Sequence, residues 1–432
     1  MDTIFALGTG AGRAAIAVIR LSGARVADVL VELTGALPPP RLARLATLRD
    51  PATGEPLDQG LALFFPGPHS ATGEDYGELQ IHGGQAVVNG VLSALANRPG
   101  LRLAESGEFA RRGFANGKLD LSQAEALADL IDAQTEAQRR QALRIAGGAL
   151  RRQVKQWREA LIDALALVEA ELDFSDEGDV AAFDDRRLRD LLDPVCAEMR
   201  AVLQDAPASE RMREGFLVMI MGPPNAGKST LLNALARRDL AIVSPTPGTT
   251  RDMIEAHLDL AGLPVTFVDT AGLREAADEI ERIGVDRVLA RVETADLALW
   301  LSVGGDILPD AVPSGVEALK VSTKCDLTPA PEGWIGISAA TSTGLERLLA
   351  EIAERAKARL GDGASSLLIR ERHRAAVCAA LSALGEARAG EKDLEFIAED
   401  LRSAARALGR IVGAVDVEHV LDAIFSRFCI GK

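Results

Sequence analysis

The sequence lacks the features that mark disulfide-bonded, membrane-spanning or polyanion-coating proteins. No uninterrupted apolar run approaches the roughly 18 residues that a membrane span requires. The formal net charge of −15 opposes general coating of a polyanion, so nucleic-acid binding would need a local patch. The four cysteines have no C-x-x-C spacing, which argues against a disulfide framework and a cysteine zinc site and fits a reducing compartment; they are Cys196, Cys325, Cys378 and Cys429.

The start of the chain also lacks a basic segment ahead of an apolar one, so we expect structure there rather than a signal peptide. These absences predict a cytoplasmic protein that has no place in a membrane. The composition, with 47% hydrophobic and 26% charged residues, is ordinary for a soluble protein. Since 432 residues exceed what one hydrophobic core usually supports, we expect two or three domains.

One window is rich in positive charge. Arg139–Arg158 holds seven basic residues and no acidic one. A local nucleic-acid patch and a solvated helix face both fit this pattern, and the sequence leaves the two open.

The first half of the chain changes in character near residue 118. Residues 1–117 alternate short apolar runs with glycine and proline and carry one expected helix at Gln85–Ala96, which predicts an α+β domain. After it, the chain becomes rich in Ala, Leu, Glu and Arg at helical spacing, and Ser122 and Glu125 have the spacing of a capping box. We therefore expect long helices within residues 118–214.

A domain of a different class follows. Residues 216–221 form a continuous apolar run, typical of a buried parallel strand, and later apolar runs alternate with helical stretches. This predicts a Ras-like, doubly wound and mostly parallel α/β domain over residues 215–357, preceded by a linker at 204–215. Since 118–214 and 358–432 are both helical, we infer one helical domain built from two chain segments, into which the α/β domain is inserted.

A phosphate-binding loop opens the α/β domain. Gly222, Gly227, Lys228 and Ser229 match the pattern G-x-x-x-x-G-K-[ST]. The glycines let backbone N–H groups converge on phosphate oxygens, the lysine supplies positive charge, and the serine hydroxyl can ligate magnesium. The preceding strand and the following helix are the context that this loop requires.

Four further motifs come after it in the order expected of a GTPase. "DTAG" at residues 269–272 can hold magnesium through water and meet the γ-phosphate, and "SPTPGTTRD" before it is typical of a switch segment. In "TKCD", Asp326 can accept two hydrogen bonds from guanine, which adenine cannot offer, and "SAA" can add backbone donors. The predicted GTP contacts are Asn225, Ala226, Gly227, Lys228, Ser229, Thr230, Ser244, Thr246, Gly248, Thr249, Thr250, Asp269, Thr270, Ala271, Gly272, Thr323, Lys324, Asp326, Ser338, Ala339 and Ala340.

The motifs resemble those of the translation-factor-related GTPases, with two departures. That family usually has Asn where this chain has Thr323, and a shorter hydroxyl side chain falls short of a carboxamide's reach, so we expect lower nucleotide affinity. Leu273 stands where Ras-like proteins carry the glutamine that orients water. We therefore expect the water-orienting group and an electrophile, with potassium as the candidate, to come from elsewhere.

Three stretches outside the α/β domain sharpen the match: "ATGEDYGELQIHGG", "ESGEFARRGFANGKLDLSQAEALADLI" and the terminal "CIGK". Together with the inserted domain they closely resemble the MnmE (TrmE) family of tRNA uridine 5-carboxymethylaminomethyl modification GTPases, over essentially the whole chain. Folate binding, specific ion sites and protein partners are implied by this resemblance, and neither composition nor spacing indicates them.

The resemblance implies that residues 1–117 bind 5-formyl-tetrahydrofolate or a related folate and dimerise. The residues that match the family's folate contacts are Arg20, Glu78, Lys118 and Lys432. Cationic side chains suit the carboxylates of folate, and a carboxylate suits the N–H edge of the pterin. Cys429 is a candidate for chemistry or for the architecture of this site, with a buried structural thiol as the competing interpretation; the residues after it do not fit prenylation.

For the GTPase cycle, the family pattern implies potassium contacts from Asn225, Ser244, Thr246 and Thr249, and magnesium contacts from Ser229 and Thr250. By position, Glu281 takes the water-orienting role, although a solvated helix charge explains it equally well.

The implied function is a potassium-dependent GTPase that acts as a homodimer, binding GTP, GDP and tRNA. With a flavin-containing MnmG-type partner, which carries FAD, it modifies C5 of the wobble uridine of certain tRNAs with a folate-derived one-carbon unit. Two alternatives stay open: a ribosome-associated GTPase switch without modification chemistry, and a free-standing one-carbon enzyme.

Overall fold

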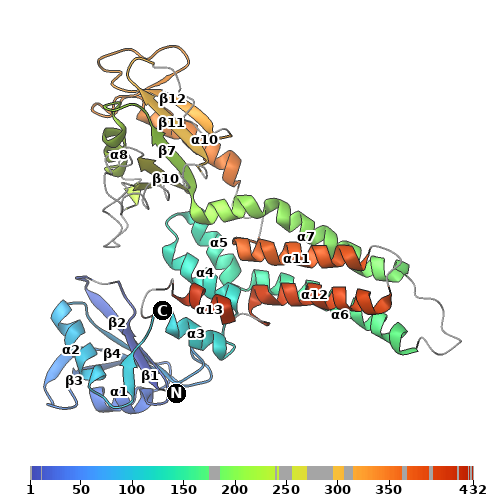
Figure 1. Ribbon diagram of the computed structural model, residues 1–432. Helices are drawn as coiled ribbons and strands as arrows, with labels where there is room; N and C mark the ends of the chain where they lie inside the picture. The colour runs from blue at the N-terminus through green and yellow to red at the C-terminus, as the bar shows by residue number, and fades with distance from the viewer. Residues whose placement is uncertain are drawn as a thin grey trace, which may run out of the picture. The chain divides into compact units, whose positions relative to one another are not determined.

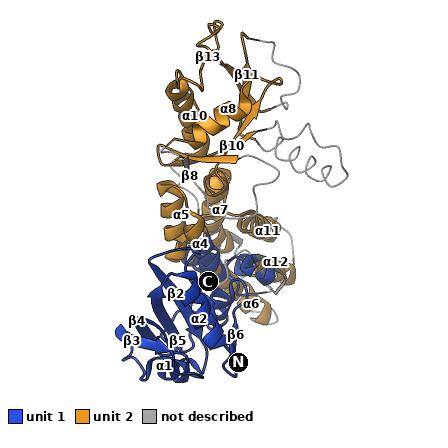
Figure 2. Cartoon of the chain, turned by 90° about the vertical axis from the view of Figure 1, so that its left-hand side faces the viewer, with its two compact units in different colours: residues 1–128, 151–155, 408–432 blue, residues 129–150, 156–407 orange. Residues whose placement is uncertain are grey.

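Two β-sheets organise the chain in this computed structural model. The structure describes residues 2–10, 12–174, 185–238, 241–242, 255–269, 295–305, 315–361, 367–388, 393–415, 418–426, 428 and 431. The chain divides into two units, coloured in Figure 2: unit 1 holds residues 1–128, 151–155 and 408–432, and unit 2 holds residues 129–150 and 156–407. This division differs from the four segments expected from composition, which stay a prediction.

Unit 1 contains a six-stranded sheet in the order β3-β4-β5-β2-β1-β6. Its strands are β1 (Thr3–Leu7), β2 (Ile16–Ser22), β3 (Arg44–Arg49), β4 (Pro56–Phe65), β5 (Tyr76–His82) and β6 (Leu101–Leu103). Helices α1 (Val26–Thr34) and α2 (Gln85–Ala96) pack on one face, where alternate strand residues such as Ile19, Leu21 and Leu79 are fully buried. The α+β class and the helix at Gln85–Ala96 are confirmed.

The opposite face of this sheet is only partly covered by a buried cluster. Ile4, Ala6 and Tyr76 pack there with Ala104 and Phe109, the last from α3 (Glu108–Ala115). Helix α3 also packs against α13 (Glu418–Phe425) and the start of α4 (Leu121–Asp132). The end of the chain thus folds back onto the N-terminal unit, as Figure 2 shows by its colour.

Unit 2 joins helices from both sides of the α/β segment. Its helices are α5 (Glu136–Ala146), α6 (Ala149–Phe174, of which 151–155 belong to unit 1), α7 (Asp185–Glu214), α11 (Glu371–Ala387) and most of α12 (Leu394–Val412). Helices α7 and α11 lie side by side (Figure 1), and Arg374 Nε on α11 donates to Glu210 Oε1 on α7 at 3.2 Å. Helical segments before and after the α/β domain therefore pack together, as the sequence predicted.

A seven-stranded sheet forms the α/β part of unit 2, in the order β13-β12-β11-β7-β10-β9-β8. The strands are β7 (Phe216–Met221), β8 (Ala241–Ile242), β9 (Glu255–Leu260), β10 (Leu263–Asp269), β11 (Leu297–Ser302), β12 (Glu317–Ser322) and β13 (Ile335–Gly336). The strands from β13 to β10 pair in parallel, and β9 and β8 add antiparallel pairs. Helices α8 (Lys228–Ala236) and α10 (Leu345–Leu360) pack against the sheet and share its buried core.

The prediction of a linker at 204–215 is wrong for most of that range, because α7 continues to Glu214 with Pro207 inside the helix. The neighbouring side chains explain this: Met212 is fully buried in the core of the α/β part, and Ser209 O accepts from Gln141 Nε2 at 3.0 Å. Tertiary packing here outweighs the helix-breaking tendency of proline.

The helix cap predicted at Ser122 is found two residues earlier, at Asp120. Asp120 Oδ1 accepts from Gln123 N at 2.9 Å, and Gln123 Oε1 accepts from Asp120 N at 3.1 Å. This reciprocal pair has the form of a capping box, so α4 begins one residue after Asp120.

Asp296 ties together the chain where it enters and leaves the α/β part. Its side chain is 1% exposed and accepts from Leu217 N at 2.9 Å. Its other oxygen lies 3.5 Å from Arg211 Nε on α7 and 3.7 Å from Arg359 Nε on α10. One buried carboxylate therefore holds the incoming helix, the first strand and the outgoing helix.

Among the described helices, none combines the length and the apolar character needed to cross a bilayer.

Candidate functional site

The phosphate-loop pattern adopts the backbone geometry that its glycines predict. Gly222 follows β7 with φ of 149°, and a Cβ there would overlap the carbonyl oxygen of Leu301 on β11. Gly227 has φ of 89° and is the residue before α8. Both positions favour glycine, so the loop turns tightly at the end of β7 and directs the start of α8 toward the same edge of the sheet.

Two side chains at the start of α8 show how this loop could hold a nucleotide. Lys228 Nζ donates to the carbonyl oxygens of Gly222 and Pro223, both at 3.0 Å, which places the ammonium group across the loop. Ser229 Oγ donates to Asp269 Oδ2 at 2.8 Å. The hydroxyl and the carboxylate that the sequence assigned to magnesium therefore meet, although they lie forty residues apart in the chain.

Residues 323–326, the segment predicted to read the base (the base-reading segment), are joined directly to the phosphate loop. Thr323 Oγ1 donates to Ala226 O at 2.7 Å, and Thr323 is 5% exposed. The hydroxyl thus reaches the phosphate loop despite its shorter length. The expected loss of nucleotide affinity stays a prediction.

The rest of this segment faces outward from the sheet. Lys324 and Asp326 are exposed, and Lys324 has φ of 56°. Cys325 N donates to Ile337 O at 3.1 Å, which brings "TKCD" beside "SAA". In that second segment Ser338 is buried and Ala340 is exposed. These loops follow the carboxyl ends of parallel strands, where ligands bind in open α/β sheets.

Part of the predicted nucleotide site lies outside the described residues. These positions are Ser244, Thr246, Gly248, Thr249, Thr250, Thr270, Ala271, Gly272 and Glu281. Asn225, the remaining potassium candidate, is exposed in the phosphate loop with φ of 62°.

A second candidate site lies on the partly open face of the sheet in unit 1. Arg20 on β2 is the register partner of Glu78 on β5, and Arg20 Nε lies 3.8 Å from Glu78 Oε1. Arg20 Nη1 donates to the carbonyl oxygen of Gly431 at 3.2 Å, which links strand β2 to the end of the chain. The structure therefore brings Arg20, Glu78 and Gly431 together.

Two glycines make this approach possible. A Cβ at Gly8 would lie 2.9 Å from Arg20 Nε. Gly431 is buried with φ of 98°, and a Cβ there would overlap the carbonyl oxygen of Leu7. Within the described residues, Arg20 Nε is buried without a hydrogen-bond partner, with Glu78 Oε1 at 3.8 Å. Cys429 and Lys432 lie outside the described residues.

Lys118 lies exposed in the turn after α3, beside the loop that leads into β5. A Cβ at Gly73 would stand 3.1 Å from Lys118 Cε, so the lysine stem passes over this glycine. Asn116 Nδ2 donates to Thr72 O at 2.7 Å and fastens the turn to the same loop. Lys118 is therefore tied to the segment that enters the strand of Glu78.

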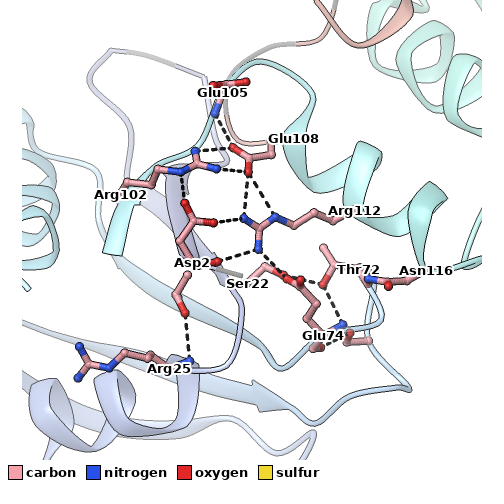
Figure 3. A network of polar contacts seen from close by, with 12 residues as sticks. Asp2, Ser22, Arg25, Thr72, Glu74, Arg102, Glu105, Glu108, Arg112 and Asn116 are labelled. Carbon is pink, nitrogen blue, oxygen red and sulfur yellow. Dashed lines mark hydrogen bonds and ion pairs between the residues drawn. The ribbon is translucent and has the colours of Figure 1, made fainter. Parts of the chain in front are cut away.

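A charged network holds the loop that precedes β5, as Figure 3 shows. The Arg112 guanidinium donates to Glu74 Oε2 at 2.9 Å, to Glu108 Oε1 at 3.0 Å and to Asp2 Oδ1 at 3.1 Å. Glu74 Oε2 also accepts from Ser22 Oγ at 2.7 Å. The network joins α3, the loop before β5 and the ends of β1 and β2 into one polar support.

The network shifts the titration of its members. Burial opposes ionisation of Glu108, but hydrogen bonds from Arg102, the Glu105 backbone and Arg112 outweigh it and lower the pKa of Glu108. For Tyr76, burial raises the pKa of the phenol, and the nearby Glu78 carboxylate adds to the rise.

The sequence did not single out Tyr76, Arg112 or Asp296. Tyr76 stands two residues before Glu78, so strand periodicity puts both on one face, and this signal was present in the sequence. The partners of Arg112 and Asp296 come from distant segments, which no local pattern reveals.

The basic window Arg139–Arg158 carries less free charge than its composition indicates. Glu136, just before it, accepts from Arg139 Nε at 2.7 Å and from Arg140 Nε at 2.7 Å. The window also spans two helices, α5 and α6.

Comparison with known proteins identifies the family. Two family descriptions match, the MnmE helical domain over residues 121–429 and the GTP-binding protein TrmE N-terminus over residues 3–118. The tRNA modification GTPase MnmE of Azorhizobium caulinodans is 54% identical over 434 residues, covering 100% of this chain and 99% of the relative. This chain belongs to the MnmE family. The MnmE of Beijerinckia indica is 50% identical and covers 100% and 96% of the two chains.

Membership of the MnmE family makes the chain a GTP hydrolase of tRNA modification. Among solved structures, the G domain of the T. maritima FeoB iron transporter is 23% identical and covers 32% of this chain and 98% of that chain. Its TM-score of 0.23 is too low to carry an argument. The assignment therefore stands on the full-length MnmE relatives, together with the geometry of the nucleotide site.

Proposed function

We propose that this MnmE-family chain is a potassium-dependent, homodimeric GTPase that modifies C5 of the wobble uridine in certain tRNAs. A flavin-containing MnmG-type protein is its partner and carries the FAD. The one-carbon unit comes from 5-formyl-tetrahydrofolate or a related folate, and the activity belongs in the cytoplasm. GTP hydrolysis brings the GTPase domains of the two protomers together and drives a conformational change.

One observation carries the GTPase part: three motifs that are far apart in the sequence converge. Ser229 contacts Asp269, and Thr323 contacts the phosphate loop at Ala226. Hydroxyl and carboxylate oxygens are the ligands that magnesium prefers, and magnesium would neutralise charge on the phosphates. Ser229 would bind it directly and Asp269 through water, while Asp326 would select guanine. Thr250 completes this proposal from outside the described residues.

Leu273 cannot orient the attacking water as a glutamine would, so another side chain must orient it and a cation must act as the electrophile. Asn225 can offer its amide oxygen to potassium beside the phosphates, and its exposed position in the phosphate loop supports that role. Ser244, Thr246 and Thr249 would complete the cation site, and Glu281 would orient the attacking water through an intermediary.

The folate part of the proposal rests on the second candidate site. Arg20, Glu78 and the end of the chain meet on one open sheet face, and the buried Nε of Arg20 suits an anionic ligand. Lys118 and Lys432 would add positive charge for the carboxylates of the folate. Cys429 would act in the chemistry or in shaping this site.

Two binding and activity measurements test the proposal. Calorimetry with 5-formyl-tetrahydrofolate should show binding to the parent protein and its loss in Arg20→Ala, because the guanidinium is the central cation of the site. His82→Ala is a matched control: its exposed ring contacts Asp58 Oδ1 at 2.8 Å, outside the site, so folate binding should be unchanged.

The second measurement separates the three candidate functions. Wobble-uridine modification should require GTP, folate, tRNA and the flavoprotein together. Absence of folate binding would favour a ribosome-associated GTPase switch, and one-carbon turnover without tRNA or flavoprotein would favour a free-standing enzyme. Either result would refute the proposal.

A further inference from the structure

Glu78 is held at one oxygen and open at the other. Its Oε1 accepts from Tyr76 Oη at 3.2 Å and lies 3.8 Å from Arg20 Nε. Within the described part of the chain, Oε2 has no hydrogen-bond partner, and the side chain is 21% exposed. One oxygen of the carboxylate is thus bonded within its own sheet, and the other is available to a ligand.

Tyr76 is rigidly placed to hold that oxygen. It is 6% exposed, and its ring packs between Phe65 at 5.9 Å and Phe109 at 6.2 Å between ring centroids. Aromatic packing of this kind restricts both side-chain torsions. Tyr76 precedes Glu78 by two residues on β5, so the two side chains stand on the same sheet face.

The polar network of Figure 3 holds the loop that precedes β5. Ser22 is the register partner of Tyr76, and Ser22 Oγ bonds both Thr72 Oγ1 and Glu74 Oε2 at 2.7 Å. Arg112 binds the same Glu74 oxygen. The loop that leads into Tyr76 is therefore fixed by charged and hydroxyl partners before the strand begins.

We propose that Tyr76 is the positioning residue of the folate site: its hydroxyl fixes Oε1 of Glu78 so that Oε2 faces the ligand. This inference rests on the folate binding of the proposed function. The phenol contributes no chemistry. Its hydroxyl restricts the Glu78 carboxylate to one orientation. This lowers the entropy cost of ordering that side chain when the ligand binds.

Tyr76→Phe isolates this role, because it removes one hydroxyl and keeps the ring between Phe65 and Phe109. Hydrogen bonds to charged groups are among the stronger ones, so calorimetry with 5-formyl-tetrahydrofolate should show about tenfold weaker binding. Ser22→Ala is the matched control. It also removes one buried hydroxyl, directly across from Tyr76. Arg112 still binds Glu74 in this variant and holds the loop, so folate affinity should stay within about twofold.

A double-mutant cycle separates positioning from general loosening of the fold. If Tyr76 acts through Glu78, then Tyr76→Phe should cost nothing further in a Glu78→Ala background, which leaves the tyrosine hydroxyl no carboxylate to hold. The melting temperature of Tyr76→Phe should fall no more than that of Ser22→Ala.

A spectroscopic measurement checks the contact without relying on affinity. The chain contains one tyrosine, so ring-labelled [13C]tyrosine gives a single NMR signal. That signal should move in Glu78→Gln and on addition of 5-formyl-tetrahydrofolate.

The outcomes distinguish this inference from the proposed function. If the parent protein binds folate and Tyr76→Phe binds it within twofold, or if the two substitutions are additive, the positioning role is refuted and folate binding stands. If the parent protein shows no binding heat, the folate function fails, and the positioning role fails with it.

Discussion

Replacing Thr323 with valine removes one hydroxyl and preserves the shape of the side chain. In the folded protein that hydroxyl donates to Ala226 O at 2.7 Å, and Ala226 is 1% exposed. Losing the donor leaves a buried carbonyl oxygen without this partner, which costs about 1–3 kcal/mol. We expect Thr323→Val to lower the free energy of unfolding by that amount.

Nucleotide affinity should change less than stability in this variant. The bond joins the base-reading segment to the phosphate loop within the protein. Part of the free-energy cost of losing it therefore falls on the protein before nucleotide binds. Fluorescent GDP should therefore bind no more than about tenfold more weakly, the equivalent of about 1.4 kcal/mol.

Thr323→Ser provides the control, because it keeps the hydroxyl and removes one buried methyl group worth about 0.8 kcal/mol. Chemical denaturation, followed by circular dichroism and by nucleotide release, compares the three proteins. If Thr323→Val proves as stable as the parent protein, the bond to Ala226 contributes nothing to stability and the prediction is wrong.

Three further predictions concern positions away from the nucleotide. Asp296→Asn should lower the free energy of unfolding by about 1–3 kcal/mol in urea denaturation, because a buried charge that faces two arginines is lost; an unchanged midpoint would contradict this. Gly431→Ala should displace the end of the chain and speed its cleavage in limited proteolysis, since a Cβ would overlap Leu7 O; parent-like cleavage would contradict the close approach. The pKa of Glu108 lies below its usual value of 4.5, so its stabilisation is complete above that pH and is lost as the pH falls through the lower folded-state pKa. Denaturation at about pH 3–6 should therefore show a smaller pH dependence in Glu108→Gln, and equal slopes would refute the assignment.

The nucleotide site was largely readable from the sequence, because its chemistry depends on local backbone geometry. Gly222 and Gly227 both have positive φ angles, which favour glycine, and a side chain at Gly222 would also overlap the backbone of Leu301. Such requirements restrict residue identity at fixed spacing, so a pattern of a few letters predicts the loop. Short apolar runs between glycine and proline likewise predicted the α+β class of the domain that carries Arg20 and Glu78.

Contacts between distant segments could not be predicted in the same way. The Arg20 bond to Gly431 spans 411 residues, and Asp296 binds arginines on two different helices. Sheet order, register and helix packing decide such pairs, and none of these is encoded in a local window. The helix through Pro207 has the same origin, since burial of Met212 in another part of the unit outweighs a local preference.

The most direct test of the proposed GTPase cycle is steady-state nucleotide hydrolysis by the purified chain, with GTP and with ATP, in potassium and in sodium. We predict hydrolysis of GTP but not ATP, stimulated by potassium and lost in Ser229→Ala, because that hydroxyl contacts Asp269 at the proposed magnesium site. Hydrolysis that ignores the choice of base or the choice of cation would contradict this cycle.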